Sequence, residues 1–335
     1  MRDSRVEVVR FVFPQHLNPR GKLYGGTMIR WVLEAGMLAA QKHARLPVVL
    51  AGMEHLFFLE PVSQGEVVTF YGQVDFVGRT SMEVSVEVIS EDPIRGTRRR
   101  PCLAYLTFVA LRRGRPAAVP PLEPEFRSED LAYREAELRR KEREPRIRDR
   151  KARRVDVRVP IPEGTPHTLV AYREIFPEWA VAEDIADAGE VLAYLDGLGG
   201  IVARRFARRV PVTVALDAVS FYEPLRVGDL MVVYCALNYV GRHAMEVGMK
   251  VLRERPETGE RFHVCTAYYT YVAVDEKGRV TEVPEYEPPT AEARKRYEEG
   301  ARRQALRRQR AEALKRGLLI TEGRLPGASD RPTTP

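Results

Sequence analysis

The stretch "HLNPRGKLYGG" (residues 16–26) decides how the first part of the chain folds. It follows a run of β-branched and aromatic residues at 6–13, and it precedes "TMIRWVLEAGMLAA" (27–40), which carries apolar groups on nearly every face. Glycine and proline end regular elements, so the pattern predicts a strand, a tight turn and a buried helix over 26–44. Asn18 stands in this turn, and no acidic partner follows it closely.

Strand-like runs follow the predicted helix. One of them, "SMEVSVEVI", alternates apolar and polar residues with period two, as a half-buried antiparallel strand does, and glycines separate the runs. The unit is therefore β-α-β-β-β-β, which an antiparallel sheet wrapped around a buried helix satisfies. The four runs cover 48–60, 66–77, 80–91 and 101–112.

The whole pattern occurs twice. A shift of 163 positions without a gap places "FLEPVSQGE" (58–66) on "FYEPLRVGD" (221–229) and "VGRTSMEV" (77–84) on "VGRHAMEV" (240–247). A repeat this long is a duplicated domain, because each copy can bury its own core. Two such copies are expected to pack about a pseudo-twofold axis, as a homodimer does.

Charged helical stretches follow each copy, starting near Ser128 and Thr290. We expect them to be solvated helices on the outside of the molecule, and we expect residues 322–335 to be disordered. The predicted organisation is a first domain at 1–122, a charged helix and linker at 123–164, a second domain at 165–285, and a charged C-terminal helix and tail at 286–335.

Composition limits the function classes. The 54 Lys and Arg against 47 Asp and Glu give a net charge of +7, but no basic face interleaved with aromatics indicates a nucleic-acid partner. Cys102, Cys235 and Cys265 lie in apolar runs and read as free thiols of a reducing compartment. No signal peptide or membrane span is recognisable, so we expect a cytoplasmic protein that binds no membrane. The histidines have no metal-ligand spacing.

The motifs "HLNPRGKLYGG", "FFLEPVSQGEVV" and "VGRTSMEV", in this order and in tandem, resemble the acyl-CoA thioesterases of the hotdog fold that carry two domains in one chain. The resemblance implies an α+β protein in which two hotdog domains form an intramolecular pseudo-dimer. It further implies hydrolysis of fatty acyl-CoA to a free fatty acid and coenzyme A without a metal or other cofactor. Tandem proteins of this family often assemble further, so a homo-oligomer is expected, such as a trimer of pseudo-dimers.

The family motif places an Asn before the paired glycines and an Asp seven residues after them on the helix. The Asn matches Asn18, but Leu33 stands at the acid position of the first copy. In the second copy Val181 stands at the Asn position and Asp196 at the acid position. Because the family builds its sites across the domain interface, we expect one working site, which pairs Asn18 with Asp196.

Hydrolysis of a thioester needs an activated water or a direct nucleophile, and a stabiliser for the oxyanion. Asp196 can serve as base or nucleophile, and the start of the helix at Gly25 and Gly26 can supply backbone N–H donors. Asn18 can hold the water or the carbonyl oxygen. The resemblance also assigns coenzyme A contacts to Arg79, Thr80 and Ser81, with Arg242 retained in the second copy.

Two other function classes remain open from the sequence. A non-catalytic acyl-CoA sensor or scaffold is one, since the second copy keeps only Gly189 of the glycine motif. A hotdog dehydratase or hydratase is the other, but it needs a His with an acid in the active helix, and residues 36–41 and 199–204 contain no His.

Overall fold

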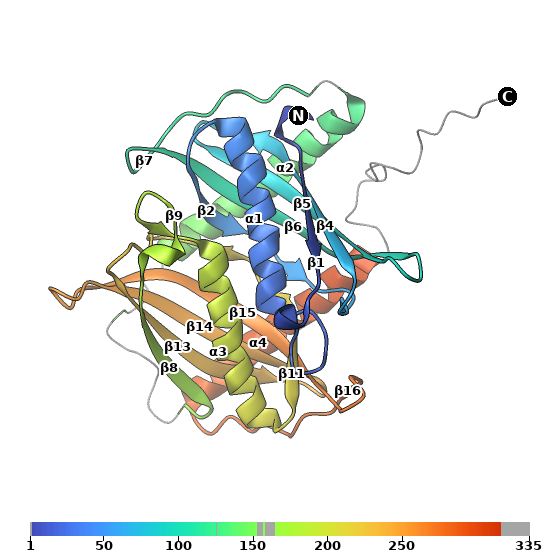
Figure 1. Cartoon of the computed structure of the whole chain (residues 1–335). Helices are drawn as coiled ribbons and strands as arrows, with labels where there is room; N and C mark the ends of the chain where they lie inside the picture. Colours follow the sequence, from blue (N-terminus) through green and yellow to red (C-terminus); the bar gives the residue numbers. More distant parts are fainter. Residues whose placement is uncertain (1, 125, 153–156, 158–164, 316–335) are drawn as a thin grey trace.

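The computed structural model describes residues 2–124, 126–152, 157 and 165–315. Two helices of 20 residues each, α1 (Gly25–Ala44) and α3 (Ala188–Ala207), lie side by side at the centre of the molecule (Figure 1). Each ends at an arginine in the left-handed region, Arg45 with φ 54° and Arg208 with φ 53°. The helix predicted over 26–44 is confirmed to within one residue.

Each central helix packs on its own antiparallel sheet. In the first sheet the long strands run in the order β1-β4-β5-β6-β2, and in the second in the order β11-β15-β14-β13-β8. The bounds of these strands are β1 (Val6–Phe11), β2 (Val48–Met53), β4 (Val67–Val77), β5 (Ser81–Asp92), β6 (Thr97–Arg112), β8 (Thr168–Glu174), β11 (Val210–Leu216), β13 (Leu230–Val240), β14 (Ala244–Glu254) and β15 (Arg261–Val274). The short elements are η1 (Arg2–Ser4), η2 (Pro14–His16), β3 (Leu56–Phe57), β7 (Arg115–Pro116), η3 (Pro177–Trp179), β9 (Ala180–Ala182), β10 (Ile185–Ala186), β12 (Val219–Ser220) and β16 (Val280–Thr281).

The two halves also exchange short strands. β3 of the first half pairs with β11 of the second sheet, and β12 of the second half pairs with β2 of the first. The edge of each sheet is therefore completed by the other half, which removes an unpaired strand edge from the interface. The pseudo-dimer consequently has a continuous hydrogen-bonded frame around its two helices.

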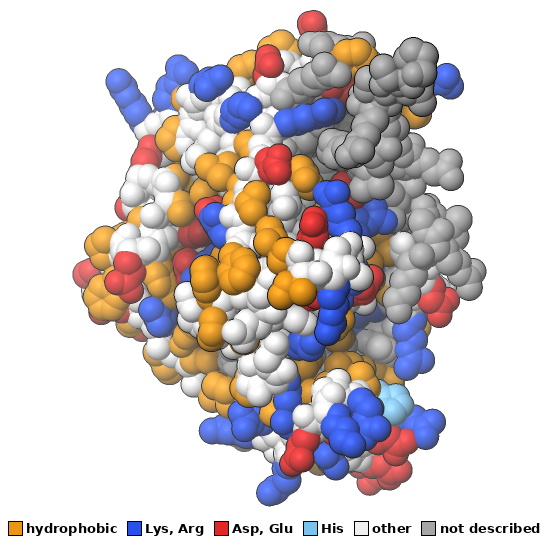
Figure 2. Space-filling view, turned by 45° about the vertical axis from the view of Figure 1, so that its right-hand side comes forward, with side chains coloured by type: hydrophobic (Ala, Val, Ile, Leu, Met, Phe, Trp, Pro, Cys, Tyr) orange, Lys and Arg blue, Asp and Glu red, His pale blue; other side chains and the backbone are white. Residues whose placement is uncertain are grey.

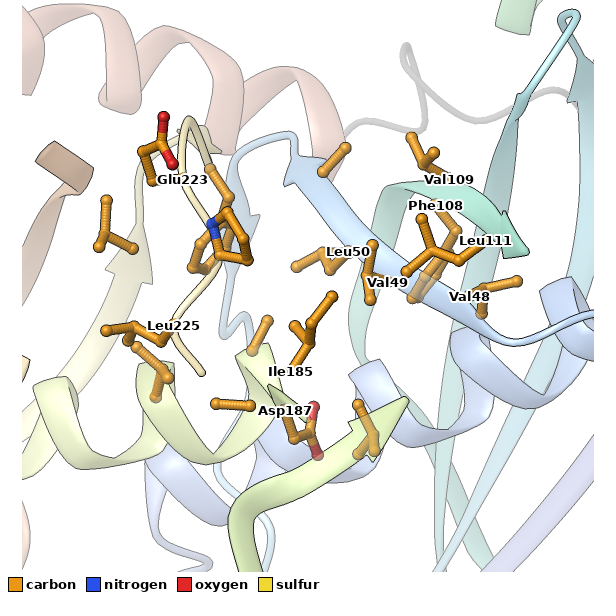
Figure 3. Close-up of a pocket in the computed structure, with 18 of the residues that line it drawn as sticks. Val48, Val49, Leu50, Phe108, Val109, Leu111, Ile185, Asp187, Glu223 and Leu225 are labelled. Atoms are coloured by element: carbon orange, nitrogen blue, oxygen red, sulfur yellow. The ribbon is translucent and has the colours of Figure 1, made fainter. Parts of the chain in front are cut away.

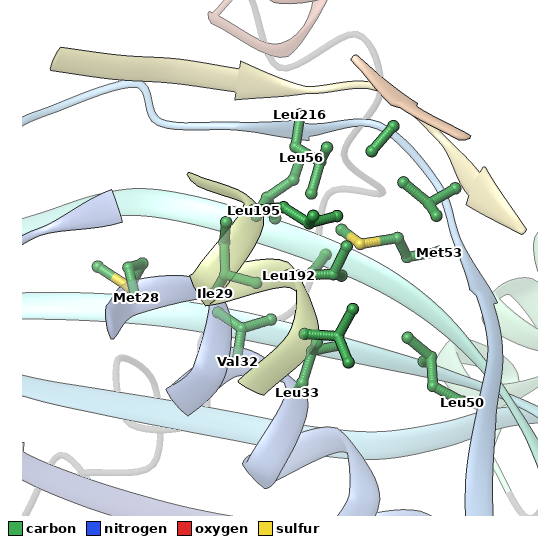
Figure 4. Packing of buried hydrophobic residues seen from close by; sticks show 14 of the residues in the cluster. Met28, Ile29, Val32, Leu33, Leu50, Met53, Leu56, Leu192, Leu195 and Leu216 are labelled. Atoms are coloured by element: carbon green, nitrogen blue, oxygen red, sulfur yellow. The ribbon is translucent and has the colours of Figure 1, made fainter. Parts of the chain in front are cut away.

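The core lies between the helices and the inner faces of the sheets. Figure 4 shows Val32 and Leu33 of α1 packed with Leu192 of α3 and with Leu50 of β2, all fully or nearly fully buried. Complete burial of one such side chain contributes about 1.5–3 kcal/mol. Because side chains of both helices share one cluster, the two halves bury a common core.

The charged stretches form α2 (Arg127–Ala152) and α4 (Ala291–Lys315), and α2 contacts β4 while α4 contacts β13. Our expectation that these helices are simply solvated is wrong for part of α4. Arg307 is buried and binds Asp217 with both ends of its guanidinium, at 2.5 and 2.7 Å, and it also contacts buried Glu246. The planar fork of arginine can bridge two carboxylates, so a charged side chain here docks the helix. The predicted disordered tail lies outside the described residues.

The surface carries apolar as well as charged groups. Figure 2 shows a face on which apolar side chains gather near the middle, with lysines and arginines around them. Several exposed apolar residues stand on the outermost strands or just beyond them, in pseudo-equivalent places. They are Val9, Phe11 and Phe13 in the first half and Val170, Tyr172 and Phe176 in the second.

Candidate active site

Asp196 lies in the middle of α3, almost completely buried between the two halves. Its Oδ1 accepts a hydrogen bond from the Thr213 hydroxyl of β11 at 2.7 Å and a longer one, 3.3 Å, from the Tyr271 hydroxyl of β15. Tyr271 also donates to the backbone carbonyl of Asp196 at 2.9 Å. Two strands of the second sheet therefore fix the carboxylate from one side.

Burial raises the pKa of Asp196 to about 6. Hydrogen bonding from Thr213, Tyr24, the Gly26 amide and Tyr271 opposes this rise, because donors stabilise the ionised carboxylate. A carboxylate with such a pKa is mostly ionised at neutral pH yet basic enough to accept a proton. This is the range in which a general base is effective.

The start of α1 faces Asp196 from the first half. A Cβ on Gly25 would lie 2.8 Å from the Thr213 Cβ and 3.1 Å from Asp196 Oδ2, and one on Gly26 would lie 3.0 Å from the carbonyl oxygen of Ala193 on α3. Side chains are thus excluded where α1 meets α3. No side chain caps the first turn of α1, whose N-cap is Tyr24, and Oδ2 has no partner of good hydrogen-bond geometry within the described residues. The site therefore combines a buried carboxylate with the positive end of a helix that no side chain caps.

Asn18 lies in the loop that leads directly into α1. Its Oδ1 accepts hydrogen bonds from the backbone N–H groups of Arg20 and Lys22, at 2.8 and 3.3 Å, which close the turn. Its backbone N–H also donates to the carbonyl of Lys22. Within the described residues Asn18 and Asp196 share no hydrogen bond, and Nδ2 donates none. Asn18 is thus a turn residue as well as a candidate donor to a substrate.

The pseudo-equivalent position in the other half is apolar throughout. Leu33 replaces Asp196, and strand register places Leu50 opposite Phe108 where Thr213 stands opposite Tyr271. We call these two places the Leu33 site (Leu33, Leu50, Phe108) and the Asp196 site (Asp196, Thr213, Tyr271). The Leu33 site opens into a cavity of about 340 Å³, whose walls in Figure 3 include Leu50, Phe108 and Ile185.

The start of α3 also differs from the start of α1. Asp187, the N-cap of α3, accepts a hydrogen bond at 2.8 Å from the backbone N–H of Gly189, which is the counterpart of Gly26. The donor that would face a substrate is therefore already used. Val181, the counterpart of Asn18, lines the cavity and has no polar side-chain atom. The Leu33 site therefore has no carboxylate at the position of Asp196, and its helix-start N–H at Gly189 is bonded to Asp187.

The hairpins predicted to contact coenzyme A lie on different sheets. The carbonyl of Thr80 accepts from the N–H of Ala110, and Ser81 pairs with Val109, a residue that lines the cavity. Arg79 is exposed. Arg242, also exposed and paired with Glu282 at 2.6 Å, lies on the sheet that carries Tyr271. The first hairpin therefore adjoins the Leu33 site and the second adjoins the Asp196 site.

Three contacts of Asp196 were missed from the sequence. In the 163-residue shift, Thr213 and Tyr271 align with Leu50 and Phe108 of the first copy. This replacement of an apolar residue by a polar one is the sequence signal that could have identified both. The side chain of Tyr24 contributes to the Asp196 pKa, and burial in turn raises the pKa of Tyr24. It stands inside the glycine-rich motif, where only its aromatic character was noted.

No cluster of three or more His, Cys, Asp and Glu side chains suited to a metal ion occurs among the described residues. No helix in this part of the chain is both long and apolar enough to cross a membrane.

The chain is similar to proteins of known class in both halves. The family model described as "Thioesterase superfamily" matches residues 20–97 and 188–260. Acyl-coenzyme A thioesterase 11 of Mus musculus is 28% identical over 316 residues, 91% of this chain and 53% of that protein. The cytosolic acyl coenzyme A thioester hydrolase of Homo sapiens is 26% identical over 305 residues, 87% of this chain and 80% of that protein. The chain thus spans about half the length of the mouse relative.

A shorter relative and a solved structure complete the comparison. Protein VdlD of Helicobacter pylori is 37% identical over 133 residues, 40% of this chain and 76% of that protein. The crystal structure of an acyl-ACP thioesterase from Bacteroides thetaiotaomicron has a TM-score of 0.51 at 13% identity, over 81% of this chain and 98% of that chain. The predicted α+β fold with two hotdog domains in tandem is confirmed.

Proposed function

The chain belongs to the thioesterase superfamily, and from this premise we propose that it hydrolyses fatty acyl-CoA to a free fatty acid and coenzyme A at the Asp196 site. The observation that carries the proposal is that a buried, hydrogen-bonded carboxylate of one half faces the uncapped helix start of the other. The relatives named as acyl-CoA thioesterases or hydrolases over most of the chain favour catalysis over the sensor alternative.

Asp196 is the proposed base or nucleophile. As a base it removes a proton from a water that attacks the thioester carbonyl carbon, and the thiolate of coenzyme A leaves as the tetrahedral intermediate collapses. As a nucleophile its oxygen attacks the same carbon and forms a mixed anhydride, which water then hydrolyses. Both routes need the ionised form of Asp196, so both predict a rate that rises with pH through the pKa of about 6.

Asn18 and Gly26 are the proposed donors to the carbonyl oxygen of the substrate. Since Oδ1 of Asn18 already accepts from two backbone N–H groups, only its Nδ2 group can act on a substrate, and that group is a donor. A donor suits an oxygen that gains negative charge better than it suits a water that must keep a lone pair for attack. This argument favours the carbonyl-oxygen role over the water-holding role.

Coenzyme A contacts are proposed for Gly25, where the absence of a side chain lets the thioester approach the backbone. Arg242 is proposed as a phosphate ligand on the Asp196 side, because its hairpin borders the strand of Tyr271. Arg79, Thr80 and Ser81 remain proposed contacts of coenzyme A, on the side of the Leu33 site. No cofactor is proposed.

The proposed assembly is a homo-oligomer, such as a trimer of pseudo-dimers, in the cytoplasm. Support comes from apolar side chains that stay exposed at the outer edges, namely Phe13 (49%) with its counterpart Phe176 (49%), and Val9 (53%) with its counterpart Tyr172 (58%). Exposed apolar groups in pseudo-equivalent places suit a symmetric interface. The name of the human relative supports the location. Light scattering after size exclusion measures the assembly directly.

The test of the function is thiol release from a panel of acyl-CoAs between acetyl and palmitoyl. We expect hydrolysis by the wild type and a loss of at least about 10²-fold in kcat for Asp196→Asn, with a smaller loss for Asn18→Ala. Asp187→Asn is the matched control, because it changes a half-buried carboxylate at the pseudo-equivalent helix start. Full activity of Asp196→Asn, or binding of acyl-CoA without thiol release across the panel, contradicts the proposal.

A further inference from the structure

The cavity at the Leu33 site has the size and lining of a binding site for a hydrocarbon chain. Its walls come from both halves and are mainly Val, Leu, Ile, Phe and Ala side chains. A protein cavity of about 150 Å³ lined by such residues binds benzene, so about 340 Å³ has room for roughly a dozen carbon atoms. Water gains few hydrogen bonds from walls of this kind.

Pseudo-symmetry relates the cavity to the proposed substrate site at Asp196. It lies between the start of α3, at Ala188, and the middle of α1, at Leu33. The Asp196 site lies between the start of α1 and the middle of α3. A ligand that fits the Asp196 site therefore meets a similar arrangement of helix and strand backbone at the Leu33 site.

The chemistry of the two places differs completely. The carboxylate and both hydroxyls that bind it are replaced by Leu33, Leu50 and Phe108. Asp187 occupies the Gly189 N–H that would stabilise an oxyanion. A thioester that entered this cavity would meet no carboxylate at the position of Asp196, and the Gly189 N–H would already be bonded to Asp187.

We propose that the cavity at the Leu33 site is a second ligand site of this protein, which holds an acyl chain without hydrolysing it. The acyl chain could belong to either of two ligands, a free fatty acid or an intact acyl-CoA. Arg226 lines the cavity, but it pairs with Asp184, and the carboxylates of Asp187 and Glu223 stand nearby (Figure 3). Basic residues at the adjoining hairpins, Arg79 and Arg113 among them, are the groups that would meet coenzyme A phosphates.

The test counts ligands on the whole chain. Dodecyl-CoA, a thioether without the thioester carbonyl, cannot be hydrolysed, and dodecanoate supplies the same chain length without coenzyme A. Equilibrium dialysis and calorimetric titration of the wild type are expected to give two bound ligands per chain for at least one of these probes. Coenzyme A alone is the control for binding through the phosphates.

A reciprocal pair of variants locates the two ligands. Ala51 lines the cavity at the bulge of β2, and its counterpart Val214 stands at the same bulge of β11, beside Thr213. Ala51→Phe is expected to remove one ligand and leave kcat for lauroyl-CoA within about twofold. Val214→Phe is expected to abolish hydrolysis and to keep the ligand at the Leu33 site. Circular dichroism and thermal melting show whether each variant is folded.

The outcomes separate the sources and can overturn the proposal. Loss of the dodecanoate ligand in Ala51→Phe identifies a fatty-acid site, and loss of the dodecyl-CoA ligand identifies an acyl-CoA site. One ligand per wild-type chain with both probes, or an unchanged count in folded Ala51→Phe, overturns the proposal. Because the count uses inert ligands, it does not depend on the proposed function, whose own failure would appear as full activity of Asp196→Asn.

Discussion

Thr213→Val tests the proposed active site most directly, because it removes one hydrogen bond and almost no volume. The Thr213 hydroxyl donates to Asp196 Oδ1 at 2.7 Å and lowers the pKa of a carboxylate that burial has raised to about 6. A hydrogen bond to a charged group contributes about 1.5–3 kcal/mol. At about 1.4 kcal/mol per pKa unit, its loss raises the pKa by about 1–2 units.

The assay is kcat/KM for one acyl-CoA as a function of pH. The wild type should be half-maximal near pH 6, and Thr213→Val should be half-maximal at about pH 7 to 8, with rates that converge at higher pH. Thr270→Val is the matched control, since Thr270 is buried on the same strand as Tyr271 and its hydroxyl has no hydrogen-bond partner in the described residues. An acid limb that stays at the wild-type pH, or an equal loss at every pH, refutes the reasoning.

Three further predictions concern stability and packing. Asp196→Asn should abolish hydrolysis but raise the free energy of unfolding at pH 7, measured by urea unfolding, by up to about 3 kcal/mol. The reason is that the pKa of Asp196 is raised from 3.8 to about 6 in the native state, which therefore loses stability as pH rises through that window. Gly25→Ala should reduce kcat by at least about tenfold, since the new Cβ would lie 2.8 Å from the Thr213 Cβ; thiol release measures this, and an unaltered rate contradicts it. Arg307→Ala should lower the free energy of unfolding by up to about 3 kcal/mol, since it removes charge-assisted hydrogen bonds to two buried carboxylates. The loss stays below that of an uncompensated buried charge, because His55 remains beside Asp217 and Arg303 remains bonded to Glu246. Hydrogen bonds and charge from Arg307 and His55 lower the pKa of Asp217 from 3.8 to about 2, which adds stability above pH 3.8 that is lost as pH falls toward 2. Acid unfolding of the wild type should follow that window, and Arg307→Ala should weaken the dependence, with the His55 part retained.

The repeated motifs indicate which residues each half contributes to the proposed site. The shift of 163 residues related Asp196 to Leu33, and the structure places Asp196 against the start of α1, at Gly25, as a composite site requires. Element bounds followed from apolar periodicity and glycine positions, which are local signals. Local signals suffice where each element buries its own apolar face.

Contacts between distant elements could not be predicted in the same way. The pairings of β3 with β11 and of β12 with β2 depend on how the halves meet, and the two-residue strands β3 and β12 have no pattern of their own. Arg307 looked like one more charge in a solvated helix, because its partners Asp217 and Glu246 are remote in sequence. The turn role of Asn18 was weighed from the sequence, but only the geometry shows which end of its amide is committed.

The difference between the two sites follows from the energetics of burying polar groups. An ionised carboxylate with a pKa raised to about 6 costs the fold up to about 3 kcal/mol at neutral pH, a large share of the stability of an ordinary domain. Leu33, Leu50 and Phe108 avoid this cost at the other site, because they bury no charge and no hydroxyl. The side chain of Asp187 also caps the start of α3, whereas no side chain caps the start of α1. The Asp196 site therefore carries the free-energy cost of a buried carboxylate, while the Leu33 site retains a cavity whose mainly apolar walls suit binding without reaction.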